Sequence, residues 1–161
     1  MTGGQEPAFS RGVRLGVDVG TVRIGVSSSD PDGTLASPVR TVLRDRRADR
    51  ADTPSATDLV ELAQLVDEYH PVEVVVGLPL TLTGQESHAA RDVRRYAGRL
   101  AERIDPVPVR FVDERLSTAV ATRRLSDRGV RGKRRRAVVD QAAAVEILQS
   151  WLDSQRRRTD A

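Results

Sequence analysis

The stretch LGVDVGTVRIGVS, residues 15–27, decides the fold that this sequence predicts. Apolar side chains alternate with small or polar ones on both sides of Gly20, and this is the period of a β-strand. The stretch therefore predicts two short strands joined by a tight turn. Asp18 shares a strand face with Gly16, and Gly25 lies among its expected neighbours. Glycines around a carboxylate leave open space, so a metal ion, a phosphate or a nucleic-acid backbone can approach. The alternative is that Asp18 only caps the turn and the glycines relieve a crowded hairpin.

The composition limits the class of protein. A chain of 161 residues predicts one domain with a proper core, here over residues 13–154, between flexible tails at 1–12 and 155–161. Cysteine is absent, which excludes disulfides and thiolate metal sites. Because His70 and His88 are the only imidazoles, any metal would rest on carboxylates, which suits Mg²⁺ or Mn²⁺. No signal peptide and no run of roughly 18 apolar residues is found, so we expect a cytoplasmic protein without membrane contact.

Positive charge is concentrated in one segment, although the net charge is only +3. Within residues 123–136 the cationic side chains are Arg123, Arg124, Arg128, Arg131, Lys133, Arg134, Arg135 and Arg136. A patch of this kind attracts phosphate backbones. The segment therefore favours a nucleic-acid partner, and the alternative is a solvated helical face followed by a loop.

Turn signals and hydrophobic periods predict the order of the elements. After the first two strands, a third over residues 34–43 contains Pro38, which favours a sheet edge because proline donates no ladder hydrogen bond. A charged connector over 44–55 follows, then a helix from Pro54 to Pro71 and a strand over 72–78. A loop over 79–84 leads to a helix with its apolar face over 93–104, which is followed by a strand over 107–114. The chain is expected to end with a helix over 117–128 and a last helix over 134–153.

Right-handed crossovers would place the fourth and fifth strands parallel to the first. The predicted fold is thus an α/β fold: a mixed five-stranded sheet, three antiparallel strands plus two parallel ones, with helices on both faces.

Three carboxylates that are distant in the sequence converge in this arrangement. Asp18 lies on the first strand and Glu114 at the end of the fifth. On a helical wheel with about 100° per residue, Asp140 falls at the border of the apolar stripe of the last helix. A carboxylate directed at the core costs several kcal/mol unless it is paired or binds a cation. The alternative to a metal at Asp140 is an ion pair with Arg136, one turn earlier.

Four motifs, in this order, closely resemble the YqgF/RuvX family: DVGTVRIGV, VVVGLPLTLTG, FVDERLSTAVA and VVDQAAAVEILQSWL. Members are Holliday-junction-resolvase-like proteins that are also described as pre-16S ribosomal RNA nucleases. The resemblance covers residues 15–152 and implies a ribonuclease H-like fold. The family's acidic positions fall on Asp18, Glu114 and Asp140. The related resolvase RuvC has an acidic residue near the end of its fourth strand, where this sequence has Gly77-Leu78-Pro79, so the resolvase geometry does not carry over.

The resemblance implies a metal-dependent endonuclease of the two-metal type that processes the 5′ end of pre-16S rRNA in ribosome biogenesis. Asp18, Glu114 and Asp140 are then the catalytic residues and metal ligands, with Asp113 a weaker candidate ligand for Mg²⁺ or Mn²⁺. Arg115 and the cationic residues of 123–136 are the expected nucleic-acid contacts. The expected partners are RNA, branched DNA and ribosomal precursor particles.

Other functions remain open at this point. A Holliday junction resolvase would favour a homodimer with two sites, whereas RNA trimming fits a monomer. A non-catalytic RNA-binding assembly factor would keep the basic segment but need no metal. Residues 18–21 also resemble the phosphate-binding hairpin of the sugar kinase, actin and Hsp70 superfamily, but those proteins need two such domains. We further expect Arg136 to neutralise Asp140 in the free protein, and residues 129–133 to become ordered when nucleic acid binds.

Overall fold

A mixed five-stranded sheet forms the centre of the computed structural model, which describes residues 9–49, 56–116 and 133–160. Its strands are β1 (Arg14–Val19), β2 (Arg23–Ser29), β3 (Ala36–Leu43), β4 (Glu73–Leu78) and β5 (Val109–Asp113). Their order is β3-β2-β1-β4-β5. β2 pairs antiparallel with β1 and β3, while β4 pairs parallel with β1 and β5. The predicted sheet is confirmed, and β3 lies at an edge as its proline predicts.

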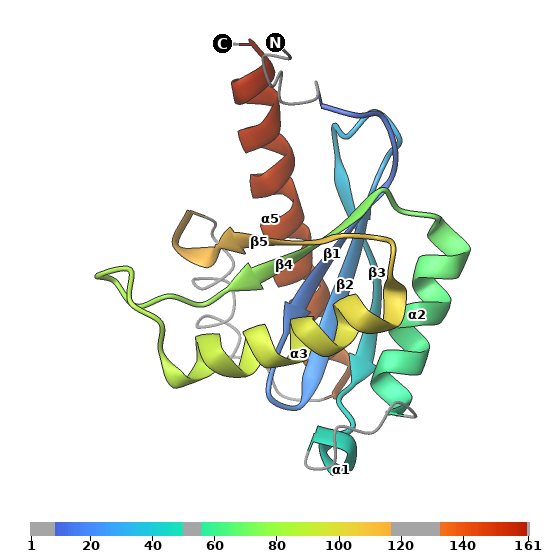
Figure 1. Ribbon diagram of the computed structural model, residues 1–161, viewed down its shortest axis with the longest axis vertical. Helices are drawn as coiled ribbons and strands as arrows, with labels where there is room; N and C mark the ends of the chain where they lie inside the picture. The colour runs from blue at the N-terminus through green and yellow to red at the C-terminus, as the bar shows by residue number, and fades with distance from the viewer. Residues whose placement is uncertain (1–8, 50–55, 117–132, 161) are drawn as a thin grey trace, which may run out of the picture.

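Helices cover both faces of this sheet (Figure 1). On one side lie α2 (Thr57–Tyr69) and α3 (His88–Ile104), and α5 (Lys133–Asp160) crosses the other. A short helix, α1 (Arg46–Asp49), follows β3, and a 3₁₀ turn, η1 (Glu114–Leu116), follows β5. α2 ends at His70 in the left-handed conformation (φ 47°). α3 begins after Ser87, whose hydroxyl accepts a hydrogen bond from the Ala90 amide.

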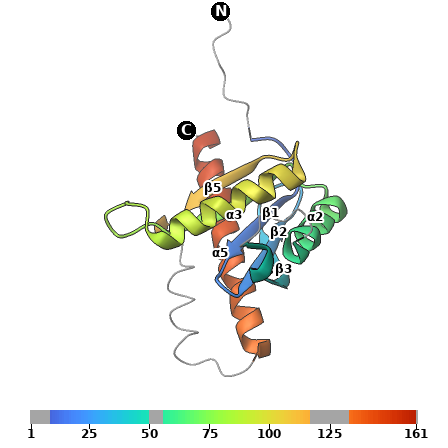
Figure 2. The same ribbon diagram turned by 60° about the horizontal axis from the view of Figure 1, so that its bottom comes forward.

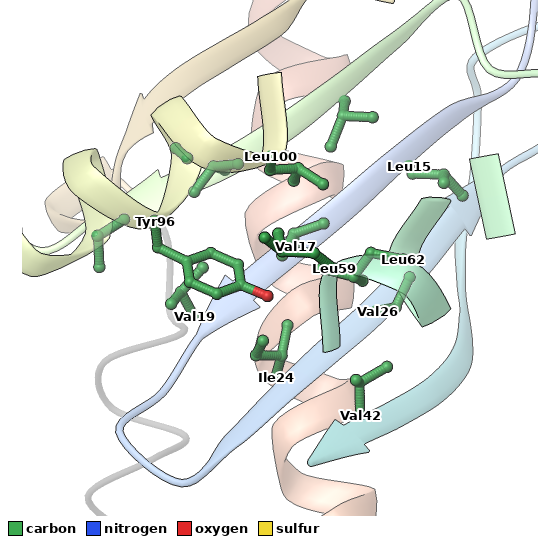
Figure 3. Close-up of a cluster of buried hydrophobic side chains, with 14 of the residues drawn as sticks. Leu15, Val17, Val19, Ile24, Val26, Val42, Leu59, Leu62, Tyr96 and Leu100 are labelled. Carbon is green, nitrogen blue, oxygen red and sulfur yellow. The ribbon is translucent and has the colours of Figure 1, made fainter. Parts of the chain in front are cut away.

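The alternation of β1 divides its side chains between two cores. Leu15, Val17 and Val19 face α2 and α3, where they pack with Tyr96 and Leu100 of α3 (Figure 3). The neighbouring core strand β4 sends Val74, Val76 and Leu78 into the same cluster. On the opposite face, Val75 packs with residues of α5, namely Ala143, Ile147, Leu148 and Leu152. Because β1 and β4 are covered on both sides, the face that holds Asp18 lies under α5.

The ends of the chain depart from the predicted boundaries. α5 does not stop at Asp153 but continues through Asp160, so residues 155–160, expected as a tail, are helical. At the other end, the ring of Phe9 lies 4.1 Å from the guanidinium carbon of Arg14, inside the expected tail 1–12. The helix predicted over 117–128 and the loop over 129–132 fall outside the described residues. Within the described ranges, no helix has the length and apolar character needed to cross a membrane.

Candidate active site

Asp18 lies between two glycines in a row that crosses the centre of the sheet. It pairs with Gly25 of β2. On the other side Val17 pairs with Val76 of β4, so Gly77 is the neighbour one residue further along. Strand alternation directs Asp18, Gly25 and Gly77 to the α5 face. Asp18 is only 2% exposed. Because its two neighbours are glycines without side chains, groups from other elements can lie beside its carboxylate.

Glu114 fills the space above Gly77. β5 ends at Asp113, and Glu114 is the first residue of the 3₁₀ turn that follows. Its side chain folds back over the sheet and is 2% exposed. A Cβ atom at Gly77 would lie 2.8 Å from Glu114 Oε1 and 2.6 Å from Ile147 Cδ1. The glycine is therefore needed for Glu114 to reach the α5 face, where Asp18 also lies.

Asp140 approaches the same row from α5, above Gly25. A Cβ atom at Gly25 would lie only 2.0 Å from the Asp140 carbonyl oxygen, so the helix backbone passes directly over this glycine. The carboxylate of Asp140 accepts a hydrogen bond from Arg23 Nε, at 2.8 Å from Oδ2, and both side chains are 23% exposed. Among the described residues its ion-pair partner is thus Arg23. The side chain of Arg136, the partner expected from sequence, lies outside the described part.

Asp113 is directed differently from Glu114. Val112 packs on the α5 side, so alternation places Asp113 on the α3 side of the strand. Arg115 holds its carboxylate, with 2.6 Å between Nη2 and Oδ2, and also donates its backbone N–H to it. The Arg115 guanidinium keeps the pKa of Asp113 below its usual range. Arg115 in turn donates to the Leu82 carbonyl at 3.2 Å, so both residues brace the loop after β4.

A buried arginine that the sequence analysis missed holds the turn next to the site. The Arg44 side chain is 2% exposed and makes two 2.9 Å hydrogen bonds to the carboxylate of Asp92 in α3. It also donates to the Gly20 carbonyl at 3.1 Å, in the turn between β1 and β2. No local pattern predicts this contact, because the partners are 24 and 48 residues away. Arg44 belongs to the segment 44–55, which the sequence predicts to be a charged connector.

The donor atoms of the row suit a hard divalent cation, which prefers carboxylate oxygens. Asp18 and Glu114 are buried on one face, and burying a carboxylate is costly without a compensating cation or hydrogen bonds. Over the described ranges, however, no three His, Cys, Asp or Glu side chains come close enough together to hold a metal ion. The third predicted ligand, Asp140, is the one engaged by Arg23.

The predicted basic segment is only partly described. Arg123, Arg124, Arg128 and Arg131 lie outside the described residues, and for Lys133 to Arg136 the structure gives the helical backbone alone. Figure 2 shows this N-terminal part of α5 extending beyond the β1–β2 turn. A second basic element was missed. α3 carries exposed arginines on its first turns at Arg91, Arg94 and Arg95.

The fold matches that of a protein solved together with a Holliday junction substrate. Thermus thermophilus RuvC in complex with Holliday junction substrate superposes with a TM-score of 0.58 at 15% sequence identity, covering 91% of this chain and 97% of that one. A second T. thermophilus RuvC structure gives a TM-score of 0.57. The chain thus has the ribonuclease H-like fold predicted from its sequence.

Sequence comparison then gives the family. The model "RuvX: Holliday junction resolvase" matches residues 12–154, so the chain belongs to the RuvX family, as its motifs indicate. A protein of Frankia casuarinae is 58% identical over 89% of this chain and 68% of its own length. A protein of Mycobacteroides abscessus is 56% identical over 91% of this chain and 84% of its own. Both bear the name "Putative pre-16S rRNA nuclease".

Proposed function

We propose that this protein is a metal-dependent endonuclease that hydrolyses phosphodiester bonds of structured RNA, with pre-16S rRNA as its substrate. The observation that carries the proposal is the row across the sheet, in which Asp18 and Glu114, each 2% exposed, share one face beside Gly25 and Gly77. Two buried carboxylates beside glycines supply the oxygen ligands that a divalent cation prefers, and the glycines leave room for a phosphate to approach. The names of the relatives favour RNA as the substrate.

Asp18 and Glu114 would hold the cation, and Asp140 would complete the ligand set. Mg²⁺ or Mn²⁺ bound there would activate a water and stabilise the leaving oxygen of the phosphodiester. A two-metal arrangement is part of the proposal. Asp113 stays outside it, because Arg115 holds its carboxylate on the other side of the strand.

The charges of the helices suggest the path of the nucleic acid. α2 and α3 lie side by side on the face of the sheet opposite to α5 (Figure 1). α2, TDLVELAQLVDEY, contains four acidic residues and no Lys or Arg. α3, HAARDVRRYAGRLAERI, is rich in arginine. It starts after the loop that follows β4, at the end of the sheet where β1 also ends and where Glu114 follows β5. We expect phosphates to contact Arg91 and Arg95, together with Arg115 and the cationic residues of 123–136.

A junction resolvase is the second candidate, because the matching family model carries that description. The discriminating experiment incubates one preparation with precursor 16S rRNA and with a four-way DNA junction, in Mg²⁺ and in Mn²⁺. Cleavage of the rRNA precursor at one site, without resolution of the junction, is the expected result. Symmetric junction cleavage by a homodimer would favour the resolvase. The RNA nuclease would act as a cytoplasmic monomer on ribosomal precursor particles.

A non-catalytic assembly factor would bind the same RNA without cutting it. Such a protein would show no cleavage with either metal and no dependence of RNA binding on Asp18. An Asp18→Asn protein that binds RNA but does not cut it would exclude this alternative, provided that the unmodified protein cuts.

A further inference from the structure

The contact between Arg23 and Asp140 joins the start of β2 to α5, across 117 residues of sequence. Arg23, Gly25 and Ser27 alternate along β2 and all face α5. Each meets the helix in a different way. Arg23 binds the Asp140 carboxylate, Gly25 lies under the Asp140 carbonyl, and the Ser27 hydroxyl donates to the Ala144 carbonyl at 2.8 Å.

Two kinds of contact are present: some fix the position of the α5 backbone, and one fixes only the direction of the Asp140 side chain. Gly25 and Ser27 fix the α5 backbone at residues 140 and 144, and a Cβ at Gly16 would lie 2.7 Å from Leu148 Cβ. The Arg23 ion pair acts only on the carboxylate of Asp140. This carboxylate can therefore change partners while the helix keeps its place on the sheet. Since both side chains are 23% exposed, water reaches the pair, and it can open without leaving either charge fully buried.

We infer that Arg23 occupies the place of the divalent cation beside Asp140. When the cation binds, Arg23 leaves the Asp140 carboxylate and binds a phosphate of the substrate instead. The inference rests on the proposed metal site. Asp18 and Glu114 lie on the α5 face, no group of three ligands is assembled among the described residues, and the third predicted ligand, Asp140, is paired with Arg23. With Asp140 held by a cation, the Arg23 guanidinium would be free to bind a phosphate of the substrate, a group that guanidinium binds well.

Exchange predicts opposite effects of Arg23→Gln on two ligands. Without nucleic acid, the variant should bind Mn²⁺ roughly two- to fivefold more tightly, as measured by electron paramagnetic resonance. This is the range expected when a partly exposed ion pair no longer competes with the metal for Asp140. Binding of a precursor rRNA fragment in Ca²⁺ should lose about 0.7 of its salt slope, as for one lost phosphate contact on a single strand. Without a divalent ion the slope should equal that of the unmodified protein.

Two controls assign these effects to the exchange. Arg40→Gln removes the same charge from an exposed pair with Glu61, 3.6 Å apart, and should leave Mn²⁺ affinity unchanged. In an Asp140→Asn background, Arg23→Gln should no longer tighten Mn²⁺ binding. Thermal unfolding of each variant checks that the fold is retained.

Unchanged or weaker Mn²⁺ binding by the Arg23→Gln protein would overturn the exchange, since it would mean that Arg23 only orients Asp140. A loss of salt slope that is equal with and without Ca²⁺ would overturn it as well. The proposed function fails separately, if the unmodified protein binds no Mn²⁺ or if Asp18→Asn leaves that binding intact.

Discussion

At the scale of single residues, glycines set how closely α5 approaches the sheet. A Cβ at Gly25 would lie 2.0 Å from the Asp140 carbonyl oxygen, and that neighbour is helix backbone, which cannot turn aside as a side chain does. Gly25→Ala should therefore displace α5 and lower the free energy of unfolding by roughly 1–3 kcal/mol, the usual cost of overpacking, with a loss of cleavage. Urea denaturation measures the first effect.

Gly98 supplies the matched control. It lies within α3, and a Cβ there would meet no atom within 4 Å. Gly98→Ala should raise the free energy of unfolding by about 0.5–1 kcal/mol, because alanine loses less backbone entropy in a helix. Equal stability of the Gly25→Ala and unmodified proteins would show that α5 is not seated as described.

The pKa of Asp92 makes stability depend on pH. The hydrogen bonds from Arg44 hold this pKa below its usual range. Such a group stabilises the fold at pH values above the unfolded-state pKa of about 3.9, and this contribution is lost as the pH falls through the lower folded-state pKa. As the pH falls from about 5 through the folded-state pKa, the Asp92→Asn protein should lose less stability than the unmodified protein. Parallel curves from urea denaturation at several pH values would contradict this.

The sequence predicted the sheet face of some residues and missed contacts between distant elements, for a physical reason. Alternation placed Asp18 and its glycines on one face, and the structure shows the same face. For Asp140 the sequence predicts a partner one helical turn away, Arg136, because helix geometry relates residues three or four apart, and this pair stays a prediction since the Arg136 side chain lies outside the described part. Arg23 comes from another element, and such a contact appears only when β2 is packed under α5. The pairing of Arg44 with Asp92 was hidden in the same way.

At the scale of elements, Arg44 connects the end of β3, the β1–β2 turn and α3. Its replacement by methionine would leave Asp92 and the Gly20 carbonyl without this donor. We expect Arg44→Met to lower the free energy of unfolding by about 3 kcal/mol, the lower end for a broken buried pair, because Asp92 is 31% exposed. Chemical denaturation provides the value.

The same strand offers a control for this change. Arg40→Met breaks only the exposed pair with Glu61 and should alter stability by less than about 1 kcal/mol. If the two variants were equally stable, the buried pair would not hold the turn.

The end of α5 shows where an element could not be predicted. The apolar period stops at Leu152, so the expected helix stopped at Asp153. Polar contacts support the helix beyond that point, since Arg156 donates to the carbonyls of Gly33 and Thr34 at 2.9 and 3.2 Å. Hydrophobic periodicity contains no information about such contacts, whereas it located the buried strand β4 to within one residue.

At the scale of the whole molecule, charge is divided between the two helices on one face. Of these two helices, the acidic α2 repels phosphates and the arginine-rich α3 attracts them. Replacing Arg91 and Arg95 together by glutamine should reduce the salt slope of RNA binding by about 0.7 for each lost contact. Fluorescence anisotropy at several salt concentrations measures it.

A variant with the same charge change far from the site tests the specificity of that effect. Arg157 and Arg158 are exposed at the C-terminal end of α5, and their replacement by glutamine should leave the slope unchanged. Equal slopes for the two double variants would mean that RNA binding follows total charge and not the surface of α3.

The central claim is that the buried row on the α5 face cuts RNA, and Asp18→Asn tests it most directly. Asparagine keeps the shape of Asp18 but removes the charge that would bind a divalent cation. With precursor 16S rRNA and Mg²⁺, we predict a loss of cleavage by orders of magnitude, with RNA binding in the absence of divalent ions and the unfolding midpoint close to those of the unmodified protein. Cleavage at the full rate by the Asp18→Asn protein would contradict the account.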